Sequence, residues 1–337
     1  MTDHYVGIDV HKRQAQVAVI DAEGDIVEEV RVANADLDEI AQKYAGGEAA
    51  IEATSNYFTI YDTLDEYLDV TLANPVKADW LAGQKQKNDR VDAKQLARFL
   101  RLDEVPESYV PSKEFRKYRA LARGRKKLVN KRTDFKNEVT ALLDQNGITF
   151  DGKLWTDEGR EFLEELTLEE PYQMLLNQWV EAVDEFTRKI KVLQRKIESV
   201  ATEVEETSLL MSVPGIAAYS SVMILSELGE IDRFDRSSEV VSYAGLDPVV
   251  RESGDSRTEH GISKQGNGYL RWILVQCANT AVHNAKDPYL SDFYWRLRET
   301  RNKPHKVAIV ATARKMLVSI FHMLRKNEPY DPPGVSA

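Results

Sequence analysis

The chain has 337 residues, of which 42% are hydrophobic and 30% charged, a composition that allows two globular domains with sizeable cores. No apolar run reaches the roughly 18–20 residues that a membrane span needs, and the start, MTDHYVGIDV, lacks the layout of a signal peptide. The single cysteine, Cys277, excludes an internal disulfide framework and a cysteine-based zinc site. We therefore expect a cytoplasmic protein.

Positive charge is concentrated in one segment of an acidic chain. The formal net charge is −10, yet residues 113–136 contain eleven lysines and arginines and two acidic residues. A dense basic segment on an acidic body is typical of a contact with a polyanion, although a solvated helical face has the same composition.

The first hundred residues alternate strand and helix patterns. Apolar or alternating runs predict strands over 5–10, 15–21, 26–32, 49–53 and 70–73. Helices are predicted over 37–44, 57–67, 77–81 and 89–102. Three strands joined by short turns, followed by strand–helix alternation, predict an α/β domain with a ribonuclease-H-like layout.

Two long helices are predicted next, over about 113–145 and 172–206, separated by an acidic stretch at 157–170. In the second helix, apolar residues recur at alternating spacings of 3 and 4, at Leu176, Trp179, Val183, Phe186, Ile190, Leu193, Ile197, Val200 and Val204. This regularity predicts a coiled coil, either between molecules or as a hairpin, with a long amphipathic helix packed within its own chain as the alternative. We expect it to hold a homodimer or homotetramer.

The remaining chain is predicted to be mainly helical up to residue 328, with a tail at 329–337. The predicted division is an α/β domain at 1–108, a basic helix and coiled-coil region at 109–207, and a C-terminal domain at 208–328. The last helix, 305–324, is mostly apolar and is predicted to lie in the core.

Four acidic residues have the pattern of a metal site. Asp9 lies in the first strand and Glu52 at the end of a short apolar strand, while Asp89 and Asp92 are three residues apart on a predicted helix and so share a face. A carboxylate within such a sheet is costly unless a cation neutralises it. Four such ligands suit two Mg²⁺ ions flanking a scissile phosphate.

Each of these acids has another interpretation when taken alone. A strand with Asp9 could begin a sugar-kinase or actin-like phosphate site, but that site needs Gly, Thr or Ser next, and Val10, His11 and Lys12 follow here. Asp89 and Asp92 could be a helix cap and a first-turn acid. The order strand-Asp, strand-Glu, helix-Asp-x-x-Asp favours the metal site.

Two further segments could contact phosphate. SVPGI, with Gly215, resembles the turn of a helix-hairpin-helix, whose backbone amides hold a DNA phosphate, although a tight interhelical turn has the same pattern. Ser253-Gly254 lies in a polar loop with cationic neighbours, as a nucleophilic serine requires, and Ser256 and Ser263 compete for that role.

The motifs GIDVHK, IEAT, KNDRVDAKQLA, SVPGI, YAGLDP, SG and GISKQGNGYLR occur in this order. With them the chain resembles the IS one-ten family of insertion-sequence transposases, which is related to the Piv-type DNA invertases. The resemblance extends from Tyr5 to about Leu324. It implies a RuvC-like domain with a D-E-D-D metal site, a coiled coil, and a C-terminal transposase domain with a catalytic serine.

Residue by residue, the resemblance implies that Asp9, Glu52, Asp89 and Asp92 bind Mg²⁺ and that Ser253 is the nucleophile. The family has Ser-Gly after its G-L-x-P block, although the acidic residues Glu252, Asp255 and Glu259 make this loop less basic than is usual there. A metal site and a serine together would form a phosphoserine intermediate, which conserves the phosphodiester bond energy for rejoining.

The resemblance also implies donor and target DNA as partners, and a noncoding bridge RNA that selects them. It places the protein at the nucleoid of a prokaryote. The residues that we expect to contact nucleic acid are Arg123, Arg125, Lys126, Lys127, Lys131, Arg132, Gly215, Lys264 and Arg271. Two other functions stay open: a Mg²⁺-dependent, Holliday-junction-type nuclease without an essential serine, and a non-catalytic nucleic-acid-binding relic.

Overall fold

The computed structural model describes residues 4–52, 57–74, 89–253 and 256–332, and gives the backbone alone for 89–92, 249–253 and 256–260. The predicted helix at 77–81 lies outside the described residues. Contacts divide the chain into two compact units, Met1–Val110 and Pro111–Ala337. Each unit has its own hydrophobic core.

The first unit is built on a five-stranded mixed sheet with strand order β3-β2-β1-β4-β5. Strand β2 is antiparallel to β1 and β3, whereas β1, β4 and β5 are parallel. Every predicted strand is present, with ends shifted by at most one residue. The bounds are His4–Val10 for β1, Gln14–Asp21 for β2, Ile26–Ala33 for β3, Glu48–Glu52 for β4 and Asp69–Ala73 for β5.

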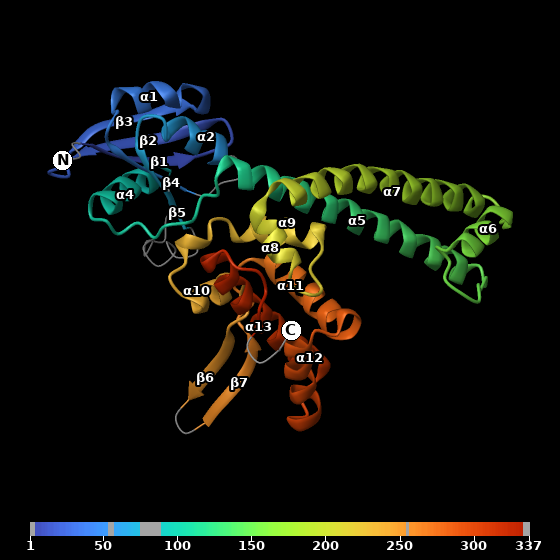
Figure 1. Ribbon diagram of the computed structural model, residues 1–337. Coiled ribbons are helices and arrows are strands. Elements are labelled where there is room, and N and C mark those ends of the chain that lie inside the picture. The colour runs from blue at the N-terminus through green and yellow to red at the C-terminus, as the bar shows by residue number, and fades with distance from the viewer. Residues whose placement is uncertain (1–3, 53–56, 75–88, 254–255, 333–337) are drawn as a thin grey trace. The chain divides into compact units, whose positions relative to one another are not determined.

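Helices cover both faces of this sheet (Figure 1). Val6, Ile8 and Val10 alternate along β1 and pack on one face with α1 and α2. Helix α4 packs on the other face, against β1 and β2. The bounds are Asn34–Asp36 for a 3₁₀ turn, Leu37–Lys43 for α1, Tyr57–Leu64 for α2 and Asp89–Arg101 for α4. This unit is the predicted α/β domain.

The second unit begins with a long antiparallel pair of helices (Figure 1). Ser112 caps the first of them, where its side chain accepts a hydrogen bond from the Phe115 N–H. Phe135 and Phe186 stack across the pair at 5.8 Å between ring centroids. The bounds are Lys113–Gln145 for α5, Asp157–Glu165 for α6 and Tyr172–Glu203 for α7.

The heptad stripe of α7 packs within the chain. Leu176, Val183, Ile190 and Ile197, which are one heptad apart, are all buried, and α5 is the main partner of α7. The burial of this stripe within the chain agrees with a hairpin and with the alternative of a helix packed within its own chain. The acidic stretch also contains a helix that its composition does not predict: α6, which is capped by Thr156.

The rest of the second unit is mainly helical around one core, with a two-stranded hairpin, β6–β7. Helix α13 is long and apolar enough to cross a membrane when only its length and composition are considered. However, 56% of its most apolar 18-residue window is buried inside the protein, so α13 is a core helix as predicted. The bounds are Glu205–Met211 for α8, Ala218–Leu228 for α9, Ser237–Tyr243 for α10, Pro248–Ser253 for β6, Ser256–Ile262 for β7, Gly268–Thr280 for α11, Pro288–Trp295 for α12 and His305–Lys326 for α13.

Candidate functional site

A row of polar residues crosses one face of the five-stranded sheet at the carboxyl end of β1. Asp9 of β1 pairs with Gln16 of β2, and each residue is only 6% exposed. The parallel register of β1 and β4 runs up to Ile8 and Ile51, so the next residue of β4, Glu52, lies beside Asp9. Residues in register on adjoining parallel strands share a face of the sheet, so the carboxylates of Asp9 and Glu52 are neighbours on this face. We call Asp9 and Glu52 the carboxylate row.

The next row on the same face is made of small residues and lets a helix come very close. Gly7 is flanked in register by two fully buried alanines. A Cβ atom on Gly7 would lie 2.0 Å from the Ala93 carbonyl oxygen and 2.5 Å from the Ala97 nitrogen. The backbone of α4 thus rests directly on β1, which a residue with a side chain would not permit. Because Gly7 is two residues before Asp9, α4 covers the face that contains Asp9.

The direction of α4 follows from its last residue. Nη1 of Arg101 donates a hydrogen bond to the Ala22 carbonyl oxygen at 3.2 Å, next to the end of β2 that pairs with the beginning of β1. Helix α4 therefore runs antiparallel to β1, and its first turn lies toward the carboxyl end of that strand. Asp89 and Asp92 are in this first turn, and Asp89 is one turn before Ala93 on the same helical face. The fold brings all four predicted acidic residues to one end of the sheet.

The chemistry at this end of the sheet suits a divalent cation. Asp9 is a buried carboxylate, and such a group needs nearby positive charge. Nε2 of His11 lies 3.5 Å from its Oδ2. Among the described side chains, no three His, Cys, Asp or Glu residues form a metal-holding group, and those of Asp89 and Asp92 are outside this description. Carboxylate oxygens are the ligands that Mg²⁺ prefers, so Asp9 and Glu52 fit such an ion.

Ser253 lies on a strand, which corrects the expectation of a polar loop. Strands β6 and β7 are antiparallel, and Ser253 pairs with Ser256 at their connected ends. In the sequence only Gly254 and Asp255 separate them, and a Gly-Asp pair between strand-forming runs is a hairpin signal that the loop interpretation missed. Ser263 follows β7 at the other end, where its N–H donates to the Asp247 carbonyl oxygen at 2.9 Å.

The two cations predicted around the loop after β7 have different surroundings. Lys264 is exposed, with a positive φ of 55°. Arg271 of α11 is half-buried, and its Nη1 donates to the Ala244 carbonyl oxygen at 2.9 Å. Lys264 therefore presents its charge to solvent, whereas Arg271 ties α11 to the end of α10.

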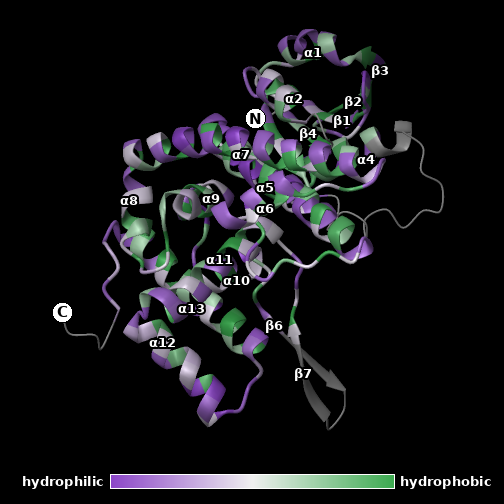
Figure 2. Cartoon of the chain, turned by 90° about the vertical axis from the view of Figure 1, so that its right-hand side faces the viewer, coloured by the Kyte–Doolittle hydropathy of each residue, from purple (hydrophilic) through white to green (hydrophobic). Residues whose placement is uncertain are grey.

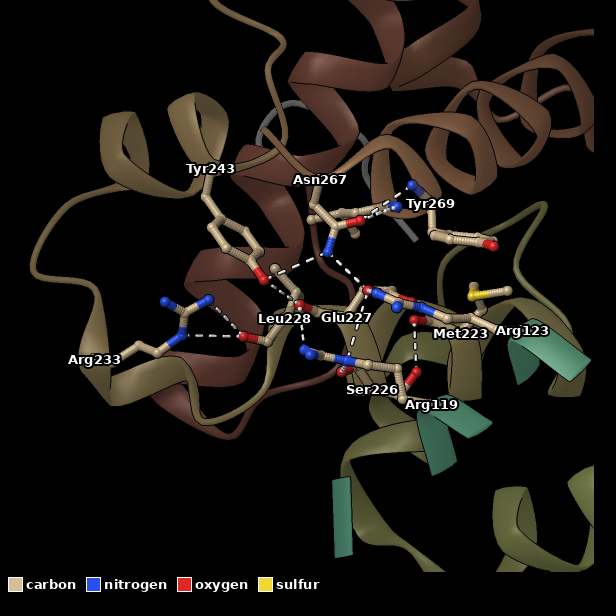
Figure 3. Close-up of polar contacts among 11 residues, drawn as sticks. Arg119, Arg123, Met223, Ser226, Glu227, Leu228, Arg233, Tyr243, Asn267 and Tyr269 are labelled. Atoms are coloured by element: carbon tan, nitrogen blue, oxygen red, sulfur yellow. Dashed lines mark hydrogen bonds and ion pairs between the residues drawn. The ribbon is translucent and has the colours of Figure 1, made fainter. Parts of the chain in front are cut away.

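Figure 3 shows a buried carboxylate, Glu227 of α9, that joins three parts of the second unit. Arg123 of α5 donates two parallel hydrogen bonds to it, from Nε to Oε1 at 2.6 Å and from Nη2 to Oε2 at 2.7 Å. The amide of Asn267 donates to Oε2 at 2.7 Å, while its own oxygen accepts the N–H groups of Tyr269 and Leu270 and so caps α11. The bond to Glu227 raises the pKa of Arg123.

This network gives Arg123, which we predicted to contact nucleic acid, a partner inside the protein. Nε of Arg119 also donates to the Ser226 carbonyl oxygen at 2.8 Å and lies 3.6 Å from a Glu227 oxygen. Sequence reasoning missed Glu227. The available signal was a single acid in the otherwise uncharged α9, AYSSVMILSEL.

Two other predicted cations of α5 lie over aromatic rings of the same unit. The guanidinium of Arg125 is 4.1 Å from the ring centroid of Tyr219, and Nζ of Lys126 is 3.6 Å from that of Trp272. Burial lowers the pKa of Lys126. These cations therefore help to hold α5 on α9 and α11 through cation–π contacts.

The remaining predicted cations of α5 are less enclosed. Lys127 and Lys131 are exposed, and Nζ of Lys131 is 3.9 Å from a carboxylate oxygen of Asp134. Arg132 donates from Nη1 to the Thr187 hydroxyl of α7 at 3.4 Å. The accessible positive charge of these three lies chiefly on Lys127 and Lys131.

Gly215, between α8 and α9, has a φ of 95°. A Cβ atom there would lie 2.6 Å from both the Cys277 carbonyl oxygen and the Ala281 nitrogen. The turn is thus pressed against the end of α11 and needs glycine for packing. This contact agrees with the alternative of a tight interhelical turn.

Two family models match the chain. One, described as "Transposase" of the DEDD type, matches residues 6–148, and the other, "Transposase IS116/IS110/IS902 family", matches residues 207–295. Together the two models match more than half of the sequence, including the carboxylate row and α4. They also include the β6–β7 hairpin that contains Ser253, which we call the serine hairpin.

Several curated proteins are similar over most of the chain. The transposase for insertion sequence element IS1111A of Coxiella burnetii is 25% identical over 96% of this chain and 90% of its own length. A pilin gene-inverting protein of Moraxella bovis is 25% identical over 83% of this chain and 81% of its own. The putative transposase y4qE of Sinorhizobium fredii is 28% identical over 72% of this chain and 59% of its own. The chain therefore belongs to the IS116/IS110/IS902 family of transposases, as its sequence motifs predict.

Proposed function

We propose that this transposase cuts and rejoins DNA through a covalent phosphoserine bond. The acidic residues Asp9, Glu52, Asp89 and Asp92 would hold the metal, and Ser253 would be the nucleophile. The observation that carries the metal site is the contact of α4 with β1 at Gly7, which brings the Asp-x-x-Asp turn to the carboxylate row. The mixed sheet with order β3-β2-β1-β4-β5 is consistent with a RuvC-like domain.

The DEDD transposase family indicates the use of a divalent metal, and we propose Mg²⁺. When bound by the four carboxylates, Mg²⁺ would neutralise charge on the scissile phosphate. The Ser253 hydroxyl oxygen would form a bond to phosphorus and lose its proton, while the bond from phosphorus to one deoxyribose oxygen breaks. That departing oxygen would take up a proton and leave as a deoxyribose hydroxyl, so the step is balanced. Attack by a deoxyribose hydroxyl of another strand would reverse these steps, so that no nucleotide cofactor is needed.

The domains proposed for these roles are 1–108 for the metal site, 109–207 for the basic and coiled-coil region, and 208–328 for the serine domain. We also propose that a bridge RNA selects the donor and target DNA, and that a homodimer or homotetramer provides the several active sites that recombination needs. Lys127, Lys131 and Lys264, whose side chains are exposed, would contact phosphates.

A covalent-adduct assay tests the chemistry. Purified protein, Mg²⁺, the RNA encoded beside its gene and end-labelled donor and target DNA are separated on a denaturing gel. The wild-type chain is expected to form a protein–DNA adduct that Ser253→Ala and Asp92→Asn both lose. Asp92→Asn removes a ligand without changing side-chain size, so its circular dichroism and DNA affinity should be retained.

The other outcomes identify the alternatives. An adduct that survives Ser253→Ala moves the nucleophile to Ser256 or Ser263. Cleavage without an adduct, in both the wild-type chain and Ser253→Ala, identifies a Mg²⁺-dependent nuclease. Intact folding and DNA binding with neither cleavage nor adduct in the wild-type chain would identify a non-catalytic relic and refute the proposal.

A further inference from the structure

Four aromatic rings gather at one end of α12. Tyr294 and Trp295 end this helix, and their ring centroids are 5.0 Å apart in an edge-to-face arrangement. His283 lies 5.3 Å from Tyr294 and 6.2 Å from Trp295, again edge to face. His305, the first residue of α13, is 5.9 Å from Tyr294. We call His283, Tyr294, Trp295 and His305 the ring cluster.

The ring cluster has a buried base and an exposed surface. Tyr294 is 2% exposed, and its hydroxyl is hydrogen-bonded to Nδ1 of His305 at 2.8 Å. Trp295, in contrast, is 44% exposed, and His283 and His305 are exposed as well. The contacts therefore fix the orientation of Trp295 while leaving much of its indole accessible to a ligand.

The backbone around the ring cluster is irregular on both sides of α12. In the described part of the chain, π-helical turns occur at Ala281–Ala285, which contains His283, and at Arg296–Thr300, which follows Trp295 directly. Such turns are uncommon and are frequent at functional sites. One such turn precedes α12 and contains His283, and the other follows α12 directly after Trp295, so both turns border the ring cluster. This irregular backbone indicates a functional site at the ring cluster.

The segment that follows the exposed tryptophan is rich in positive charge. The segment from residue 295 to 306 contains five basic residues and a single acid, Glu299, in a chain whose net charge is −10. The turn is ordered by a hydrogen bond from Nη1 of Arg298 to the Lys303 carbonyl oxygen at 2.7 Å. Figure 2 shows the hydrophilic end of α12 and the chain that follows it. We call Arg296, Arg298, Arg301, Lys303 and Lys306 the basic turn.

An exposed aromatic ring next to a basic turn has the chemistry for binding unpaired nucleotides. A base stacks on an aromatic side chain through its face, and cations neutralise the adjoining phosphates. Bases in a duplex are already stacked on their neighbours, so a ring of this kind selects nucleotides outside the duplex. We propose that the ring cluster and the basic turn bind unpaired nucleotides of a DNA strand, with a base on Trp295 and phosphates at Arg301 and Lys306.

The occupant is DNA because the enzyme is a transposase, and a strand that is being exchanged leaves its duplex. The proposal rests on this action on DNA, but on neither the metal site nor the serine. Binding can therefore be measured without metal, and a failure of the phosphoserine chemistry would leave the result unaffected.

The test is fluorescence anisotropy of the full-length chain in EDTA, with labelled single-stranded DNA, duplex DNA and RNA of one sequence. Trp295→Ala is expected to weaken single-strand binding about 5- to 100-fold, the effect of removing one stacked ring, while duplex affinity stays within about twofold. Trp295→Phe should restore most of the affinity. Met174→Ala, at another exposed apolar residue, is the matched control and should change nothing.

A second pair of substitutions tests the basic turn without touching the rings. Arg301→Gln with Lys306→Gln should flatten the salt dependence of single-strand binding. Thermal unfolding by circular dichroism verifies that each variant is folded. Unchanged single-strand affinity in folded Trp295→Ala, an equal loss for duplex, or a larger loss for RNA than for single-stranded DNA in that variant would overturn the proposal. If Trp295→Ala fails to fold, an unchanged salt dependence in the double variant would overturn it.

Discussion

Glu227 illustrates how one buried charge can organise three helices. Its carboxylate lies in a site without solvent contact, where it is costly unless every oxygen has a partner. Arg123 provides two hydrogen bonds from α5, and Asn267 adds one from the beginning of α11. The polar network thus connects the basic helix to the loop that follows the serine hairpin.

We predict that Glu227→Ala lowers the free energy of unfolding by about 3–5 kcal/mol, because the half-buried Arg123 and the Asn267 amide lose their acceptor. Glu227→Gln, which keeps an acceptor but not the charge, should lose less. Urea unfolding followed by tryptophan fluorescence measures both. Asp134→Ala, which removes the exposed partner of Lys131, is the control and should cost at most about 1 kcal/mol. If Glu227→Ala lowers the free energy of unfolding by no more than this control, Glu227 does not hold the three helices together.

At the scale of elements, the close packing of α4 on β1 determines where the acidic residues meet. The contact depends on the missing side chain of Gly7 and on the small residues Ala93 and Ala97. Because α4 runs antiparallel to β1, its first turn, with Asp89 and Asp92, lies toward the end of β1 that contains Asp9. A shift of α4 would therefore move Asp89 and Asp92 relative to Asp9. Packing and the proposed chemistry are therefore coupled at a single glycine.

We predict that Gly7→Ala destabilises the first unit by about 1–3 kcal/mol and abolishes metal-dependent cleavage, because the new Cβ atom would overlap the backbone of α4. Thermal unfolding and the adduct gel measure the two effects. Gly124→Ala is a matched control, since a Cβ atom there would lie 3.8 Å from Cδ1 of Leu193 and alanine favours a helix. Full cleavage activity in Gly7→Ala would show that the position of α4 is unimportant.

For the whole molecule, the relevant property is the distribution of charge. An acidic chain binds nucleic acid only where cations are locally concentrated and accessible. Several cations of α5 are occupied by Glu227, Tyr219 and Trp272, so the composition of this helix overstates the charge that it presents.

We predict that Lys127→Gln combined with Lys131→Gln reduces the slope of log affinity against log salt for duplex DNA by about 1 to 2, since each phosphate contact contributes about 0.9. Titrations by anisotropy between low and moderate salt measure this slope. Lys189→Gln, an exposed lysine of α7 outside the basic segment, should leave it unchanged. An unaltered slope in the double variant would exclude Lys127 and Lys131 as phosphate contacts.

The sequence was sufficient for the strands of the first unit, the two long helices and the family, because each depends on a local pattern or an ordered set of motifs. Alternation placed β1 to β5 within one residue, and the heptad spacing identified the buried stripe of α7. The hairpin of Ser253 was missed because its polar strands lack that alternation, although the Gly-Asp connection was visible.

Tertiary structure decided what these patterns contact. Spacing alone could not tell whether the α7 stripe faces another molecule or α5, since both partners bury the same residues. Nor could composition separate Arg123, which is held by Glu227, from the exposed Lys127. Local sequence determines the chemistry of a side chain and the secondary structure around it. The partner of that side chain can be 104 residues away, as Glu227 is from Arg123, and only the folded chain brings the two together.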